Sequence, residues 1–171
     1  MAHRTNFNDI DFWIVVLIYL LTIHLATVES IGRLNLNYFV LTAWLPHLLG
    51  ILGASFIIVY TPLFYFLKRK RPNLNKRLLK MHIFGNSISF MFVTLHMISN
   101  LILLPLGIGV LSYLFVLLLM SSGFSYRFGI LKPLNVFMKD IPHYNRYLHI
   151  SLTISFYIVF LFHLLKATNF Q

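Results

Sequence analysis

Long apolar stretches alternate with short polar connections along the whole chain. A helix needs about 20 apolar residues to cross the hydrocarbon core of a membrane. Stretches of this kind predict membrane-spanning helices over about residues 12–28, 43–67, 78–104, 108–122 and 148–166. The pattern therefore predicts an all-α fold: a polytopic membrane helical bundle of five transmembrane helices, forming a single domain over residues 1–171.

The composition supports a membrane protein with no second, soluble domain. Of the 171 residues, 58% are hydrophobic and only four are acidic. No stretch is long and polar enough to build a flavin or nucleotide domain. We therefore expect any reductant or oxidant to come from another protein.

Positive charge is gathered in two connections and indicates the orientation. The first holds Lys68–Arg71 with Lys76, Arg77 and Lys80, and the second holds four cations against one acid. By the positive-inside rule both connections are cytoplasmic, which places the amino terminus in the cytoplasm. We expect the membrane to be the plasma membrane. A docking patch for an acidic redox partner is the alternative explanation of the first connection, and topology is the simpler one. Such confined charge favours lipid head groups over nucleic acid as the partner.

Two of the expected spans carry a histidine pair at the same spacing. His96 follows His82 by 14 residues in the third span, and His163 follows His149 by 14 residues in the fifth. Fourteen residues make a rotation of about 1400°, roughly 40° short of four turns, so both histidines of a pair share a helix face. They are separated by roughly 21 Å along the axis, which is most of the hydrocarbon thickness.

The charge-derived topology pairs these histidines by depth. The third and fifth spans run in the same direction, so His82 and His149 share the cytoplasmic depth and His96 and His163 the outer depth. A lone histidine in an apolar helix is usually a packed, hydrogen-bonded residue, but four at a repeated spacing favour a functional role. Two facing imidazole pairs are the arrangement that holds two haems, each with two axial ligands, between the spans.

The absence of cysteine narrows the kind of cofactor. The chain contains no cysteine, which excludes disulfides, iron–sulfur clusters and covalently attached c-type haem. Histidine is then the natural iron ligand for b-type haem. The sequence predicts two b-type haems, with His82, His96, His149 and His163 as the metal ligands.

The third span, with His82-x-x-Gly85-x-Ser87 and then His96, resembles the first haem-binding helix of the cytochrome b subunit of quinol-oxidising complexes. The fifth span is similar to the second haem-binding helix of that family. Gly109 and Gly123, also 14 residues apart, resemble the glycines that let an intervening helix approach the haems. The resemblance covers residues 78–166 and implies cofactor contacts at Gly85, Gly109 and Gly123.

The ligand arrangement is also similar to the transmembrane domain of ferric reductases and NADPH oxidases. The chain departs from both families. It has a shorter connection before the fifth span and no match to the quinol-site motif of the first family, and it has neither the sixth span nor the flavin domain of the second. The resemblance therefore does not identify the protein that donates electrons or the one that accepts them.

These observations predict a dihaem b-type cytochrome that carries electrons across the membrane. It would act as the electron-transfer subunit of a respiratory or other quinone-linked oxidoreductase complex, with redox partner subunits, membrane lipid and a candidate quinone as its partners. The alternatives are a stand-alone electron conduit like the ferric reductases, or a haem-free structural anchor. A metal-ion carrier is a third alternative, but it would favour carboxylates, and the third and fifth spans contain none.

Other polar residues have two interpretations each. Arg77, Lys80 and Arg146 are candidate partners for haem propionates, with membrane anchoring as the equal competitor. His24 and His47 could hold a third haem, line a quinone site or carry protons, whereas His3 and His143 are expected in exposed loops. The hydroxyl and amide residues near the histidines could tune the ligands or bond haem propionates, but ordinary bonds to backbone carbonyls within the helix are the simpler expectation. These residues are Asn86, Ser87, Ser89, Thr94, Ser151, Thr153 and Ser155.

Overall fold

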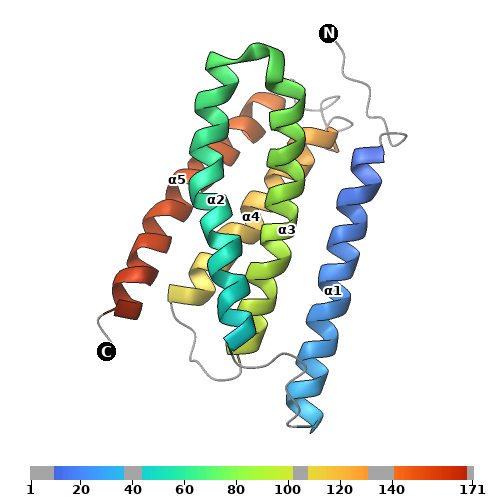
Figure 1. Ribbon diagram of the computed structural model, residues 1–171, viewed down its shortest axis with the longest axis vertical. Coiled ribbons are helices and arrows are strands. Elements are labelled where there is room, and N and C mark those ends of the chain that lie inside the picture. Colours follow the sequence, from blue (N-terminus) through green and yellow to red (C-terminus); the bar gives the residue numbers. More distant parts are fainter. Residues whose placement is uncertain (1–9, 37–43, 102–107, 131–140, 169–171) are drawn as a thin grey trace. The chain divides into compact units, whose positions relative to one another are not determined.

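The computed structural model describes residues 10–36, 44–101, 108–130 and 141–168, and regular structure within these ranges is helical. The helices appear in Figure 1, and a short 3-10 turn, η1 (Pro72–Leu74), joins the second to the third. Their bounds are α1 (Ile10–Leu36), α2 (Trp44–Lys70), α3 (Asn75–Leu101), α4 (Ile108–Phe128) and α5 (Ile141–Thr168).

All five helices are long and apolar enough to cross a membrane. They also leave large apolar side chains uncovered by protein: Leu17 is 66% exposed, Ile51 64% and Leu161 56%. In water such surfaces would be costly, whereas lipid chains cover them without penalty. The prediction of an all-helical fold with five helices long and apolar enough to span a membrane is therefore confirmed for the described residues.

Several connections expected to be polar loops are helical instead. Residues 29–36 continue α1, residues 68–70 complete α2, and residues 125–128 belong to α4. The fifth helix begins at Ile141 rather than near residue 148, so His143 lies in a helix and its loop assignment was wrong. The cause is general, because Lys, Arg and other straight-chain polar residues are good helix formers, and hydropathy marks the membrane boundary rather than the helix end. Residues 37–43 and 131–140, which belong to the expected connections over residues 29–42 and 125–147, lie outside the described residues, as do residues 102–107 at the expected end of the third span.

Local signals decide where two of these helices stop. At the end of α4, Gly129 has a φ of 63°, and the Ile130 amide donates to the Ser125 carbonyl oxygen at 3.2 Å. This is a Schellman ending, which needs a residue without a Cβ in the left-handed region. At the end of α2, Pro72 cannot continue the helix, and the Leu74 amide donates to the Arg71 carbonyl oxygen at 3.1 Å to close η1.

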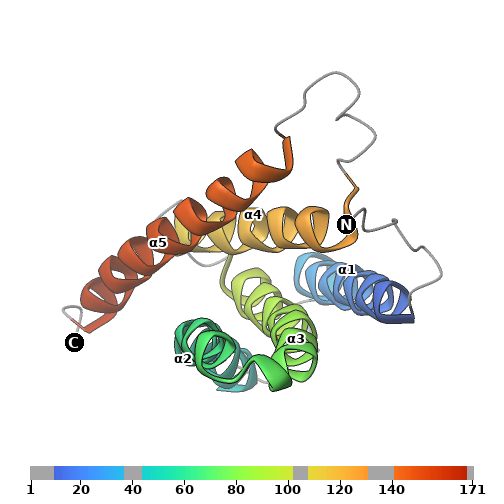
Figure 2. The ribbon, with the colours of Figure 1, turned by 90° about the horizontal axis from the view of Figure 1, so that it is seen from above.

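The described helices fall into two compact units. In the unit of residues 13–105, α2 and α3 form an antiparallel hairpin in which the Tyr60 hydroxyl donates to the Leu78 carbonyl oxygen at 3.1 Å. Figure 2 shows α3 between α2 and α1. Contacts between α1 and α3 include an edge-to-face pair of Tyr19 and Phe90 and a 3.3 Å hydrogen bond from Ser99 to the buried carboxylate of Glu29.

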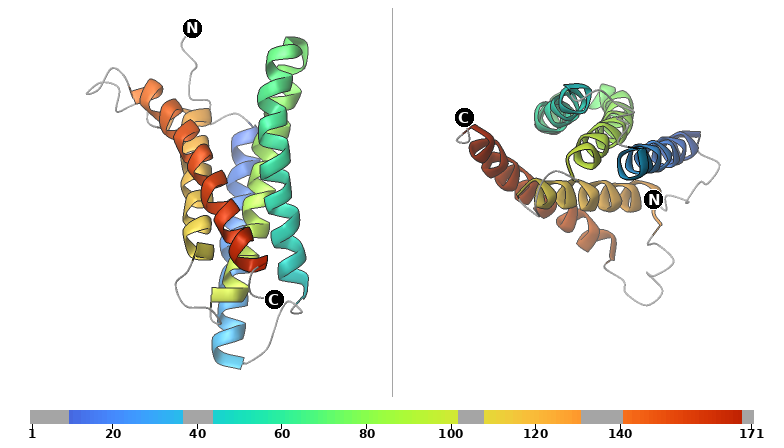
Figure 3. Two further views of the ribbon diagram at one scale, coloured as in Figure 1. Left: turned by 90° about the vertical axis from the view of Figure 1, so that its left-hand side faces the viewer. Right: turned by 90° about the horizontal axis from the view of Figure 1, so that it is seen from below.

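Among the described residues, the second unit contains 10–12, 108–130 and 141–168, and its main feature is the packing of α4 against α5. The two helices run antiparallel, because Gly109 near the start of α4 meets His163 near the end of α5, and Gly123 meets His149. Figure 3 shows this pair from two further sides.

Candidate functional site

The four predicted ligands are divided between the two units. His82 and His96 lie on α3, and His149 and His163 lie on α5, each half-buried. Each unit therefore presents one histidine pair at the expected 14-residue spacing on a continuous helix. The pairing of α3 with α5 across the two units stays a prediction.

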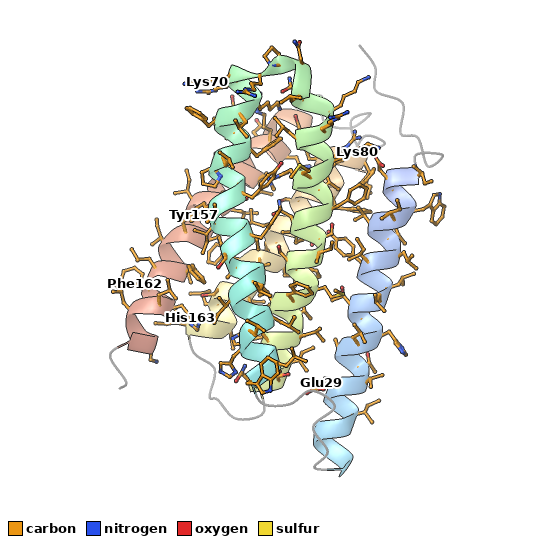
Figure 4. All side chains as sticks on the ribbon, in the orientation of Figure 1. Glu29, Lys70, Lys80, Tyr157, Phe162 and His163 are labelled. Carbon is orange, nitrogen blue, oxygen red and sulfur yellow. The ribbon has the colours of Figure 1, made fainter. Side chains whose placement is uncertain are left out.

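On α5, each histidine packs against a glycine of α4. A Cβ built on Gly123 would lie 3.1 Å from Cε1 of His149, and one built on Gly109 would lie 3.3 Å from Cε1 of His163. Figure 4 shows His163 on α5. The two glycines are spaced like the two histidines, so the repeated spacing reflects one interhelical contact made twice. Gly109 and Gly123, two of the three glycines predicted to contact a cofactor, thus contact the imidazoles of α5. Their contact with haem stays a prediction.

The α2–α3 hairpin repeats this arrangement with one exception. A Cβ on Gly50 would lie only 2.6 Å from Cγ of His96. One 14-residue step further along α2, however, the residue beside His82 is Phe64, whose ring stacks on the imidazole at 4.4 Å between centroids and 12° between planes. Gly50 and Phe64 were not among the predicted site residues. The signal that could have found them is their spacing, which matches that of the histidines.

The hydrogen bond at Nδ1 of His96 assigns its proton. This nitrogen lies 3.1 Å from the Pro46 carbonyl oxygen, which can only accept, so Nδ1 carries the hydrogen. The amide nitrogen of Asn100 carries two hydrogens; it donates one to the His96 carbonyl oxygen at 2.7 Å and lies 3.3 Å from the same ring atom. The Pro46 carbonyl oxygen is the closer partner of Nδ1, and we assign the ring hydrogen on that contact. With its proton on Nδ1, His96 keeps the lone pair on Nε2, the atom that can bind a metal.

The same assignment follows at His149 by a different route. The Ser122 hydroxyl donates its single hydrogen to the Leu119 carbonyl oxygen at 3.0 Å, so towards Nδ1 of His149, 2.9 Å away, it can only accept. Nδ1 therefore carries the proton and Nε2 the lone pair. Such an outer hydrogen bond, which fixes the tautomer and the ring orientation, is typical of histidines that ligate metals.

The remaining histidine of each pair, His82 on α3 and His163 on α5, is surrounded mainly by ring contacts. His82 stacks on Phe64, and the amide nitrogen of Asn86 lies 3.2 Å from its Nδ1 and 3.4 Å from its Nε2. His163 lies against Gly109, with the Phe160 ring 6.4 Å away between centroids. Gly85 of α3 makes room for a side chain of α2, because the Phe56 ring occupies the place that a Cβ would take.

The remaining candidates have simpler surroundings. As expected, Ser87, Thr94 and Thr153 donate to backbone carbonyls one turn earlier. The side chains of Arg77 and Arg146 are exposed, as membrane anchoring and propionate binding both allow.

His24 and His47, the two histidines without a partner at the 14-residue spacing, have different surroundings. His24 is exposed on α1, whereas the ring of His47 meets that of His96 edge to face at 5.1 Å between centroids. His3, which was expected in an exposed loop, lies outside the described residues.

The donor set can be compared with what a free metal ion and a haem iron each require from a protein. In the parts of the chain that the structure describes, no three His, Asp or Glu side chains gather into a group that could hold a metal ion. A structural zinc site, for example, needs four such ligands, whereas a haem iron takes four nitrogens from the porphyrin and needs only axial imidazoles from the protein. His96 and His149, with the lone pair assigned to Nε2, are of the kind that such a site would use.

Searches of protein families, of curated proteins and of solved structures each found no match to this chain. The resemblance to cytochrome b therefore rests on the residues described above.

Proposed function

We propose that this protein is a dihaem b-type cytochrome that carries electrons across the membrane. The observation that carries the proposal is the state of His96 and His149. Each has its Nδ1 engaged by an oxygen acceptor, Pro46 or Ser122, which leaves Nε2 to bind iron. Since each of these histidines has a partner 14 residues away on the same helix, the chain offers two ligands on α3 and two on α5.

In this proposal, His82 and His149 hold an inner haem, and His96 and His163 hold an outer haem. When bound, the two irons would supply two one-electron carriers at different membrane depths. The protein's own residues position the imidazoles and exclude water from them. Gly50, Gly109 and Gly123 supply the close helix approach, and the hydroxyl of Ser122 makes His149 a more basic ligand.

The basic segments fit the cytoplasmic orientation that the proposal requires. Lys70 and Lys80 lie at the end of the α2–α3 hairpin opposite to Glu29 (Figure 4), and both basic side chains are exposed. The amino terminus would then be cytoplasmic. We propose the plasma membrane as the membrane in which the protein lies. We propose redox subunits of a quinone-linked complex as partners, with a quinone as a candidate ligand.

Two alternatives make different predictions. A stand-alone conduit of the ferric-reductase kind would carry both haems but would be purified without partner subunits. A haem-free structural anchor would use its histidines only for hydrogen bonds such as those to Pro46 and Ser122, and would show no visible haem spectrum.

A pyridine haemochrome assay on the purified protein, with a reduced-minus-oxidised visible spectrum, tests the proposal. We expect about two b-type haems per chain. The matched control is His24→Gln, since His24 is exposed on α1 and should leave the haem content unchanged. Folded protein without haem after expression with ample haem supply would refute the proposal. One haem per chain would mean that only one of the two proposed haem sites, inner or outer, is occupied.

A further inference from the structure

The exception at His82 belongs to a row of four nearly parallel rings. Phe56, Tyr60 and Phe64 follow one another at four-residue steps on α2, and His82 of α3 completes the row, which we call the aromatic ladder. Successive ring centroids are 4.9, 6.4 and 4.4 Å apart, with interplanar angles of 18°, 24° and 12°. The closest and most nearly parallel step is the one between Phe64 and His82.

The aromatic ladder is fixed to α3 at several points. Phe56 occupies the space over Gly85, and the Tyr60 hydroxyl donates to the carbonyl oxygen of Leu78, one turn before His82. Tyr60, Phe64 and Leu78 are the buried members of one apolar cluster, each at most 9% exposed. Because these anchors lie on the same helix as His82, the Phe64 ring has little freedom to move relative to the imidazole.

We infer that Phe64 is a positioning residue that fixes the ring plane of His82, an inference that rests on the proposed function of His82 as a haem ligand. His96 and His149 are oriented by an acceptor at one ring nitrogen. The Asn86 amide instead reaches both nitrogens of His82 at similar distances, so it does not select a single orientation. The stacked ring does, since rotation of the imidazole about its Cβ–Cγ bond would break the parallel contact.

The presence of Phe64 beside His82 would make the two proposed haem sites unequal. Beside His96, His149 and His163 the neighbouring helix presents a glycine, which leaves space at the imidazole, whereas beside His82 it presents a buried phenyl ring. The plane of an axial imidazole influences the electronic structure of a low-spin ferric haem. Loosening Phe64 should therefore alter the inner haem and leave the outer one unchanged.

The first test uses the haem-free protein in detergent, with histidine labelled at carbon ε1 for NMR. The ring current of Phe64 should shift the Cε1–H resonance of His82 upfield, and His82→Gln identifies that resonance by its loss. Phe64→Leu should abolish the upfield shift, whereas Phe64→Tyr, which keeps the ring, should retain it. The matched control is Phe66→Leu, because Phe66 is on the same helix but 53% exposed and outside the aromatic ladder.

The second test uses the haem-loaded protein and electron paramagnetic resonance of the ferric state. Phe64→Leu should shift or broaden the low-spin signal that depends on His82, with haem content unchanged, and Phe64→Tyr should restore it. An unshifted His82 resonance in the wild-type protein, or a haem signal unaffected by Phe64→Leu, would overturn the inference. If Phe64→Leu does not fold, the wild-type and Phe64→Tyr resonances still decide. A protein without haem would refute the proposed function, while the NMR test would still report on the stack.

Discussion

The Ser122 hydroxyl accepts a hydrogen bond from Nδ1 of His149 at 2.9 Å while donating its own hydrogen to the Leu119 carbonyl oxygen. Ser122 is buried, and its chain neighbour Ser121 is exposed and bonds only to the Leu117 carbonyl oxygen among the contacts described. Adjacent serines of α4 thus differ in whether they touch a proposed ligand.

This difference predicts the effect of two alanine substitutions. Ser122→Ala should weaken binding of the haem that depends on His149 by roughly 10–100-fold, the usual cost of removing a hydrogen bond behind a metal-bound histidine. Ser121→Ala should leave it unchanged. Haem transfer to an excess of apomyoglobin measures both, and equal transfer rates from the two variants would contradict the proposed role of Ser122.

The glycines beside the histidines predict a graded response to alanine. In a helix interior, alanine is favoured over glycine by about 1 kcal/mol. At Gly109, where the new Cβ would be 3.3 Å from the nearest imidazole atom, that gain roughly offsets the crowding. At Gly50 the Cβ would be 2.6 Å from Cγ of His96, so overpacking of about 1–3 kcal/mol should prevail.

Thermal unfolding in detergent, followed by circular dichroism, checks this order. Gly50→Ala should lower the unfolding midpoint clearly, Gly123→Ala less, and Gly109→Ala least or not at all. A Gly50→Ala protein as stable as the wild type would show that α2 and α3 do not approach each other as closely at His96 as described.

Hydropathy and charge predicted the existence of the five helices but not their ends. The helices run past the apolar stretches because charged residues such as Lys68–Lys70 suit a helix outside the membrane, and α2 stops only at Pro72. The histidine spacing likewise predicted that each pair shares a helix. The sequence could not reveal which atoms meet those rings, because Phe64 and Pro46 reach them through the register of the α2–α3 hairpin.

The topology predicts which side of the membrane exposes η1. Asn73 lies in this exposed turn, between two groups of cations that the positive-inside rule places in the cytoplasm. A cysteine introduced at Asn73 into this cysteine-free chain should react with a membrane-impermeant maleimide in inside-out vesicles and not in intact cells. Labelling of intact cells would invert the orientation and exchange the inner and outer haems.

The pairing of the histidines decides whether the chain can carry charge between two membrane depths. If His82 pairs with His149, replacing either by alanine should remove the same redox component and leave the other spectrally intact. His96 and His163 should form the second equivalent set. The reason is that an iron needs both axial nitrogens to stay low-spin and firmly bound, while the other haem keeps its own ligands roughly 20 Å away along the helices.

Potentiometric titration of the four single variants, each compared with the control His24→Gln, measures the pairing. The diagonal alternative would put the two ligands of one iron at opposite depths, too far apart for one macrocycle to span, because 14 residues of helix rise by about 21 Å. Spectra in which His82 and His163 variants lose one component and His149 and His96 variants lose the other would therefore defeat the topology and the pairing together. Loss of both components from every single variant would instead indicate that the two sites form only as a unit, with α3 and α5 held together by both haems.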